Sequence, residues 1–306
     1  MLAEKYRPKS LDEVVGQEHV IPHLKEIVKK GVSIHLLFTG PPGCGKTSTA
    51  YAFSNEVNLP IVELNASDER GINVIRGKVK TYAYSYGRRI ILLDECDSMT
   101  EDAQHALRRI MEKTQSIFIL TANDEYKIID PIKSRCAIFR FRKLRDEEVL
   151  RVIVKILKAE KVNLKITTEF KEAVKTLVDN VSGDLRKALN MLETLITANK
   201  EVTVENIKSL IPPDLATQVL SIVLEGRWEE GLKRMEDLYI QNKLDTYLTI
   251  NSLYKAIEGL KTNPLVKLKM YEKLAEAERG IRIGCNPLIQ LSGFLASAYA
   301  MSVGVK

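Results

Sequence analysis

One octapeptide of this chain has residue types that suit phosphate binding. Residues 40–47 read G-P-P-G-C-G-K-T and directly follow the apolar run Ile34–Thr39. The glycines let backbone N–H groups wrap around phosphate oxygens, Lys46 supplies a positive charge, and Thr47 offers a hydroxyl to Mg²⁺. The spacing predicts a nucleoside triphosphate site between a strand and a helix. The residues expected to bind the nucleotide here are Gly40, Pro41, Pro42, Gly43, Cys44, Gly45, Lys46, Thr47 and Ser48.

Two acidic residues follow a second apolar run. Residues 90–97 read I-I-L-L-D-E-C-D. An acid at the carboxyl end of such a strand lies beside the phosphate loop, so Asp94 is predicted to hold Mg²⁺. The adjacent Glu95 is expected on the other side of the strand, where it could orient or deprotonate an attacking water. The alternative is that both acids only form a solvated strand end.

Three further polar residues could reach a triphosphate, and each also has an ordinary structural explanation. Asn123 closes the run L-T-A-N and either positions water against the γ-phosphate or forms a turn. Arg135, in S-R-C, either enters a neighbouring subunit's site or is a surface charge. Arg186, in S-G-D-L-R-K-A-L-N after a candidate cap at Asp184, either reaches the phosphates from a lid or lies on a helix surface.

The elements that must position these residues begin with a parallel sheet. Five short runs rich in β-branched residues alternate with helical patterns, which predicts an α/β module with helices on both faces of a five-stranded parallel sheet. The expected strands are Ile34–Thr39, Ile61–Asn65, Arg89–Asp94, Ser116–Thr121 and Cys136–Phe141.

The chain from Asp146 onward has a helical pattern. Apolar residues such as Val149, Ile153 and Ile156 recur at intervals of three and four. The pair Pro212-Pro213 cannot continue a helix, so a domain boundary is predicted there. More helices are expected after it, with breaks near Gly226, Asn263-Pro264, Gly280 and Gly284.

The composition excludes several classes of protein. The 306 residues are 45% hydrophobic and 28% charged, which is ordinary for a globular protein. The four cysteines form no C-x-x-C pair, so neither a disulfide framework nor a zinc site is expected. Their spacing instead predicts a reducing, intracellular compartment. No apolar stretch approaches the ~20 residues that span a bilayer. The net charge of +6 suits nucleic acid but also an ordinary surface rich in Lys.

Seven motifs in order resemble the small subunit of replication factor C, a sliding-clamp loader of the AAA+ ATPase family. The motifs are E-K-Y-R-P, V-V-G-Q, G-P-P-G-C-G-K-T, L-N-A-S-D-E-R-G, L-L-D-E-C-D, S-R-C and G-D-L-R-K-A-L-N, over Glu4 to Asn190. The resemblance implies an AAA+ nucleotide-binding domain at 1–145, a small helical lid at 146–211 and a helical collar for oligomerisation at 212–306. Leu2 and Ala3 stand where this family commonly has a tryptophan.

The same resemblance assigns roles to matched residues. Lys46 and Thr47 would bind ATP and Mg²⁺, Asp94 and Glu95 would serve metal and water, and Asn123 and Arg186 would be the two sensors. Arg135 would act as a finger on the ATP of the neighbouring subunit. The adenine pocket would be lined by Tyr6, Arg7, Pro8, Val15 and Gly16. Asn65 is expected to hold Glu95 in an inactive pose.

Contacts with DNA are expected from two helical segments with basic faces. Residues 72–82 carry Arg76 and Lys80 four apart, and residues 100–113 carry Arg108 and Arg109. A clamp loader must read phosphates rather than bases, for which Lys and Arg are suited, although a solvated basic face has the same composition. Tyrosines at 82, 84 and 86 either dock on the clamp or pack locally.

The expected function is that of a DNA-stimulated ATPase subunit, in which ATP binding opens and loads the clamp and hydrolysis releases it. The expected partners are the sliding clamp, primer-template DNA, and a large subunit with other copies or paralogues in a ring. The lack of a basic tail favours an archaeal source over a nuclear one. Three alternatives stay open: a catalytically silent structural subunit of the same ring, an AAA+ motor such as a branch-migration helicase, and a P-loop kinase.

Overall fold

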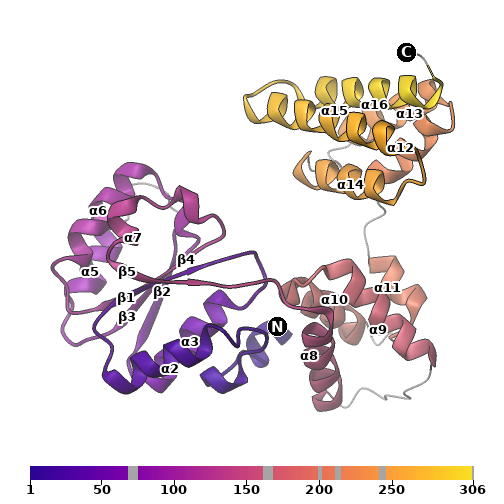
Figure 1. Ribbon diagram of the computed structural model, residues 1–306. Coiled ribbons are helices and arrows are strands. Elements are labelled where there is room, and N and C mark those ends of the chain that lie inside the picture. The colour runs from indigo at the N-terminus through magenta and orange to yellow at the C-terminus, as the bar shows by residue number, and fades with distance from the viewer. Residues whose placement is uncertain (68–74, 161–167, 199–201, 211–214, 241–245, 305–306) are drawn as a thin grey trace. The chain divides into compact units, whose positions relative to one another are not determined.

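The computed structural model describes residues 1–67, 75–160, 168–198, 202–210, 215–240 and 246–304. Within the chain, residues 1–211 and 212–306 form two compact units (Figure 1). The four cysteines, Cys44, Cys96, Cys136 and Cys285, are free. In the described ranges, no helix combines the length and the apolar composition needed to cross a membrane.

The first unit contains the predicted parallel sheet. Its five strands lie in the order β2-β3-β4-β1-β5, and every paired neighbour is parallel. Both ends of each strand lie within one residue of the predicted bounds. The strands are β1 (His35–Thr39), β2 (Ile61–Asn65), β3 (Ile90–Asp94), β4 (Ile117–Ala122) and β5 (Cys136–Arg140).

The register of the sheet brings the polar strand ends together. Asn65 pairs with Asp94, and Thr39 pairs with both Ala122 and Arg140. Parallel strands share one carboxyl edge, so the residues that follow β1, β3 and β4 emerge side by side. The candidate site residues at 40–47, 94–95 and 123 are therefore neighbours in space.

Helices cover both faces of this sheet, as predicted (Figure 1). Successive β1 residues point to opposite faces: Phe38 packs with Leu24 and Phe53, whereas Leu37 packs with Leu107 in a second core. One face is covered by α2 (Ile21–Lys30) and α3 (Lys46–Glu56), and the other by a π-helix (Ile75–Val79), α5 (Lys80–Tyr84), α6 (Glu101–Met111) and α7 (Asp130–Lys133).

A helical bundle completes the first unit. Its members are α8 (Asp146–Ala159), α9 (Thr168–Val181), α10 (Leu185–Thr197) and α11 (Val204–Leu210). The short N-terminal helix α1 (Leu2–Lys5) packs on α10, and Leu2 is buried in the bundle core with Ala3 against it. The N-terminal arm thus belongs to this bundle rather than to the sheet.

The second unit is wholly helical in its described residues. Its helices are α12 (Leu215–Leu224), α13 (Trp228–Ile240), α14 (Thr246–Gly259), α15 (Pro264–Arg282) and α16 (Pro287–Ser302). Breaks occur near Gly226, Asn263 and Gly284, but the break expected near Gly280 is wrong, because that glycine lies inside α15. A Cβ at Gly280 would lie 2.5 Å from Gln290 Oε1 on α16, so close helix packing accounts for the glycine.

Candidate nucleotide-binding site

The loop between β1 and α3 has the backbone shape that its glycines allow. Gly40, Gly43 and Gly45 all have positive φ, and Gly45 is the N-cap of α3. Gly43 is required for a second reason, since a Cβ there would overlap Asp184 Oδ1, the N-cap residue of α10. The loop and the helical bundle therefore touch at a point where only glycine fits.

The ammonium of Lys46 lies at the carboxyl edge of the sheet. Its Nζ donates to Gly40 O at 2.7 Å, to Pro41 O at 2.9 Å and to Asn123 Oδ1 at 2.8 Å. Lys46 is buried, and burial lowers its pKa, while the nearby Cys44 and Asp94 act to raise it. The structure thus brings together Lys46 and Asn123, which the sequence separates by 77 positions.

A hydroxyl and a carboxylate lie beside this ammonium. Thr47 Oγ1 donates to Asp94 Oδ1 and Oδ2, both at 3.1 Å, and the Thr121 hydroxyl donates closely to Asp94 Oδ1. Glu95 N donates to Thr121 Oγ1 at 3.1 Å. Glu95 lies just past the end of β3, its backbone is in the left-handed region (φ 56°), and it lines the pocket together with Asp94. Thr121 belongs to the run L-T-A-N, from which only Asn123 was predicted to act at the site.

Asn65 and its surroundings are only partly described. Its Oδ1 accepts from Ser67 N and from Ser67 Oγ, both at 2.9 Å. In this structure the Asn65 oxygen therefore caps its own turn. The remainder of L-N-A-S-D-E-R-G, residues 68–71, lies outside the described residues.

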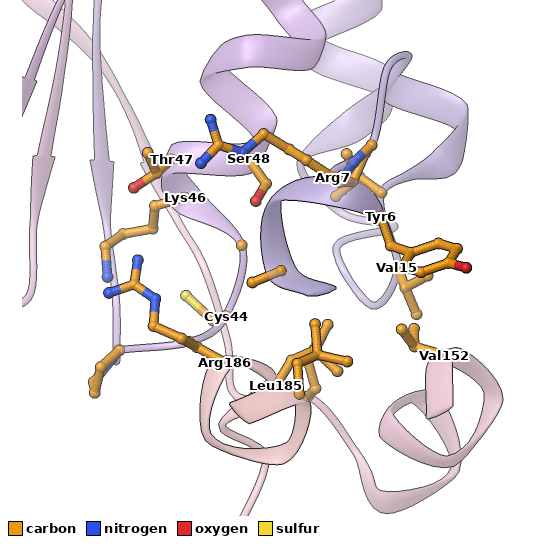
Figure 2. A pocket seen from close by; sticks show the side chains of 18 of the residues that line it. Tyr6, Arg7, Val15, Cys44, Lys46, Thr47, Ser48, Val152, Leu185 and Arg186 are labelled. Atoms are coloured by element: carbon orange, nitrogen blue, oxygen red, sulfur yellow. The ribbon is translucent and has the colours of Figure 1, made fainter. Parts of the chain in front are cut away.

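A pocket runs from these polar groups to an apolar wall. It is lined by Ala3, Tyr6, Arg7, Pro8, Glu13, Val14, Val15, Pro42, Gly43, Cys44, Gly45, Lys46, Thr47, Ser48, Asp94, Glu95, Thr121, Asn123, Leu144, Val152, Lys155, Ile156, Leu185, Arg186 and Leu189. Figure 2 shows the nitrogen-bearing ends of Lys46 and Arg186 at one end and Val15, Val152 and Leu185 gathered at the other. The pocket therefore offers cations to one part of a ligand and an apolar surface to another part.

The N-terminal arm forms one side of the pocket. Tyr6 Oη donates to Glu160 Oε1 at 2.7 Å, and Lys5 Nζ donates to the same oxygen at 2.6 Å, which ties the arm to the residue after α8. The Arg7 guanidinium lies over the Tyr51 ring, 4.3 Å from its centroid. These contacts fix the arm between the bundle and α3.

Some expected lining residues lie elsewhere. Gly40 and Pro41 do not line the pocket and instead give their carbonyl oxygens to Lys46. Gly16 is behind the wall: its φ is 78°, and a Cβ there would overlap Leu144 Cδ2 and approach Glu148 Oε2 to 2.8 Å. Gly16 therefore permits close packing at the start of the bundle.

The apolar wall from α8 and α10 was not predicted. Val152, Ile156, Leu185 and Leu189 have the spacing of a helix core face, which gives no separate signal for a ligand. Leu185 precedes Arg186 in G-D-L-R-K-A-L-N, so the motif contained a hint that this helix faces the site. Asp184 caps α10, as expected, by accepting from Lys187 N at 3.0 Å.

Arg135 lies outside the pocket of its own chain. Its Nη1 donates to Pro131 O at 2.7 Å and to Ser134 Oγ at 3.3 Å, and its Nη2 donates to Glu112 Oε1 at 2.5 Å. The side chain is about one third exposed. Arg135 is therefore not part of the pocket in its own chain.

The expected DNA-contacting residues lie on one side of the sheet. Lys80 and Arg109 are exposed, on α5 and α6 respectively, and Arg108 is partly buried beside Glu112. The π-helix that carries Arg76 packs on α6, while the Arg76 side chain lies outside the described residues. Of the three tyrosines, Tyr86 is fully exposed and follows the end of α5.

Comparison with known proteins identifies both units. Residues 36–144 match the family model "ATPase family associated with various cellular activities (AAA)", and residues 211–297 match "Replication factor C C-terminal domain". The AAA match supports nucleotide binding by this site.

Curated relatives match over nearly the whole chain. The chain is 40% identical to the replication factor C small subunit of Sulfolobus acidocaldarius, over 96% of this chain and 94% of that protein. It is 38% identical to the replication factor C small subunit of Methanothermobacter thermautotrophicus, over 96% and 95%.

Among solved structures, the fold is similar to the Thermotoga maritima RuvB Holliday junction branch migration motor. The TM-score is 0.57 at 19% identity, over 72% of this chain and 80% of that one. At this identity the likeness concerns the fold alone.

Proposed function

The chain belongs to the replication factor C small-subunit family, and we propose that it binds and hydrolyses ATP as one subunit of a sliding-clamp loader. The observation that carries the proposal is the meeting of Lys46, Asn123 and the Thr47–Asp94 pair at one edge of the sheet. ATP binding would favour the clamp-opening state of the ring, and hydrolysis would release the closed clamp on DNA.

The phosphate end of the pocket suits a triphosphate. Lys46 Nζ now bonds three oxygens, and phosphate oxygens would replace some of them when ATP binds. The amide groups at the start of α3 point to the same place, where the helix dipole favours negative charge. Arg186 at the start of α10 adds a second cation from the bundle.

The Thr47–Asp94 pair suits Mg²⁺. A hydroxyl and a carboxylate are the hard oxygen donors that this ion prefers. Among the described residues no group of three or more His, Cys, Asp or Glu could hold a metal, so the nucleotide would supply part of the coordination. Once bound, Mg²⁺ would neutralise charge on the phosphate oxygens.

Three further residues would take part in ATP hydrolysis: Glu95, Asn123 and Arg135. Glu95 would orient or deprotonate the water that attacks the γ-phosphorus, and Asn123 would hold the γ-phosphate side of the site with Lys46. Arg135 would contact the nucleotide of the neighbouring subunit, since it lies outside its own pocket. Hydrolysis would then require assembly, which is a useful property for a switch.

The apolar end of the pocket suits adenine. Val15 on the arm side faces Val152 and Leu185 of the bundle (Figure 2), and Tyr6 and Arg7 complete this end. A flat base between these side chains would join the arm to α8 and α10. Nucleotide binding would therefore stabilise the docking of the bundle on the sheet.

Assembly and DNA contact would involve other surfaces. The 212–306 unit would serve as the collar that joins subunits into a ring with a large subunit and copies or paralogues. Primer-template DNA would contact Lys80, Arg108 and Arg109, together with Arg76. The sliding clamp would be the substrate of the assembled ring.

Steady-state ATP hydrolysis by the assembled protein tests this function. Rates are measured with and without primed DNA and clamp for the wild type and for Arg135→Ala. Stimulation that disappears in the variant supports a clamp-loader ATPase whose arginine acts in trans. No hydrolysis in the wild type supports the silent structural subunit, and equal rates in both proteins contradict a trans-acting Arg135.

A further inference from the structure

Two arginines from different elements share one carboxylate at the end of α6. Arg135 Nη2 donates to Glu112 Oε1 at 2.5 Å, and Arg108 Nε lies 3.6 Å from the same oxygen. Arg108 precedes Glu112 by one helical turn, whereas Arg135 follows α7. All three side chains are about one third exposed.

Glu112 is the acceptor of Arg135 that comes from a different helix. The other acceptors, Pro131 O and Ser134 Oγ, belong to the same short segment as Arg135. Glu112 comes from α6, which is anchored in the core by Leu107 and Ile110. A long side chain that is already oriented loses less freedom when it binds a phosphate.

Arg108 is the more weakly held of the two. Its separation from Glu112 is that of an ion pair without a hydrogen bond, and its buried Nε has no hydrogen-bond partner. A DNA phosphate could therefore draw Arg108 away from Glu112 while Arg135 stays bound. The carboxylate would then serve Arg135 alone.

We infer that Glu112 is a positioning residue that orients Arg135 for the neighbouring subunit's ATP, and does so more firmly when DNA binds Arg108. The inference rests on the proposed function, because it concerns the trans-acting role of Arg135. Glu112 thereby links DNA contact at Arg108 to ATP hydrolysis through one carboxylate.

The test measures kcat and KM for ATP in the assembled ring carrying Glu112→Gln, with and without primed DNA. The amide keeps the shape but loses the charge. We expect kcat with DNA to fall roughly two- to fivefold, the range expected for one partly exposed ion pair, with a smaller fall without DNA and an unchanged KM. Glu101→Gln is the matched control: it makes the same change at the other end of α6, where the carboxylate is 79% exposed.

A double variant separates positioning from a general structural effect. If Glu112 acts through Arg135, then Glu112→Gln causes no further loss in an Arg135→Ala background. An additive loss, or a DNA-stimulated rate that is unchanged or higher in Glu112→Gln alone, overturns the inference. Glu112→Asp keeps the charge on a shorter side chain, so it should give a partial loss even if the Gln variant is unstable.

Failure of the proposed function has a different signature. A wild-type ring without DNA-stimulated hydrolysis, or an Arg135→Ala ring with full activity, contradicts the clamp-loader proposal and removes the basis of this inference. A stimulated wild type with an inactive Arg135→Ala ring and a normal Glu112→Gln ring contradicts only the role of Glu112.

Discussion

Lys46 Nζ donates a hydrogen bond to Asn123 Oδ1 at 2.8 Å, which links the phosphate loop to the end of β4. The contact joins the cation that would hold the β- and γ-phosphates to the amide that would sense the γ-phosphate. The Asn123 oxygen accepts from Lys46, and the same amide carries two N–H donors that could bind a phosphate oxygen, so one side chain can respond to the state of the nucleotide.

Asn123→Ala should therefore impair hydrolysis more than binding. We expect kcat to fall at least ~10-fold, as for loss of one polar group that contacts the transition state, and the dissociation constant for ATP to change by less than ~3-fold. Single-turnover hydrolysis and equilibrium binding of a fluorescent ATP analogue measure the two effects. A loss of binding equal to the loss in kcat would assign Asn123 to ground-state binding instead. Asn251→Ala, on an exposed position of α14, is the control.

Gly43→Ala should disturb both the loop and its contact with the bundle. The new Cβ would overlap Asp184 Oδ1, and the backbone has φ 69°, so we expect a loss of ~1–3 kcal/mol in stability and no measurable ATP binding. Gly293→Ala in α16 is the control, because nothing lies within 4 Å of its Cβ and alanine favours a helix. Thermal unfolding and ATP binding distinguish the pair, and a Gly43→Ala protein that binds ATP normally would contradict the close contact.

Glu148 should make the first unit sensitive to acid. Its buried carboxylate accepts from Arg142 and from the backbone and side chain of Arg145, and these bonds, with Arg142 first, lower the pKa of Glu148 to about 2. Because the pKa of Glu148 in the folded protein is below the ordinary value of 4.5, its contribution to stability is fully present above pH ~4.5 and is lost as the pH falls toward 2.

Glu148→Gln should thus reduce the free energy of unfolding by ~1–3 kcal/mol at pH 7 and by much less at pH 3. Circular dichroism melts at both pH values measure the difference. Glu278→Gln, which breaks an ion pair with Arg282 on the surface of α15, should change little at either pH. An equal effect of Glu148→Gln at both pH values would show that its charge is not the stabilising feature.

His35 should add a second pH dependence at milder pH. Its Nδ1 accepts from Phe118 N at 3.1 Å and its Nε2 lies 3.1 Å from Met111 O, so the neutral ring carries its proton on Nε2. Burial lowers the pKa of His35, so its contribution to stability is present above pH ~6.5 and is lost as the pH falls below that value. Between pH 7.5 and 5, the free energy of unfolding should change less with pH in His35→Asn than in the wild type. Equal pH dependence in the two proteins would contradict this role.

Tyr6→Phe should loosen the N-terminal arm. The variant loses the hydrogen bond to Glu160 but keeps the ring, so we expect weaker ATP binding by roughly 2- to 5-fold, consistent with the ~1 kcal/mol net value of one hydrogen bond. Tyr126→Phe, at a 96% exposed position, is the control. Equal affinities of wild type and Tyr6→Phe in an ATP titration would show that the docked arm does not support the adenine end of the pocket.

Predictions from the sequence were most accurate where a single short segment determines the structural feature. The five strands and the helical remainder follow from local periodicity, and Asp184 caps α10 as its position predicts. Gly280 shows the limit of such reasoning, since a glycine that reads as a helix break instead allows α15 to approach Gln290 on α16. Gly16 packs closely against Leu144 and Glu148, and a motif does not distinguish that need for a glycine from a ligand contact.

The family, the phosphate loop and the acid that ends β3 could be predicted from the sequence, because the backbone and side chains of a few contiguous residues supply that chemistry. The contacts between distant residues required the folded chain: Lys46 with Asn123, Arg135 with Glu112, and the arm with α8 and α10. Parallel strands align their carboxyl ends whatever lies between them in the chain. Which helix faces close the pocket depends on packing between separate segments, and periodicity records only that those faces are apolar.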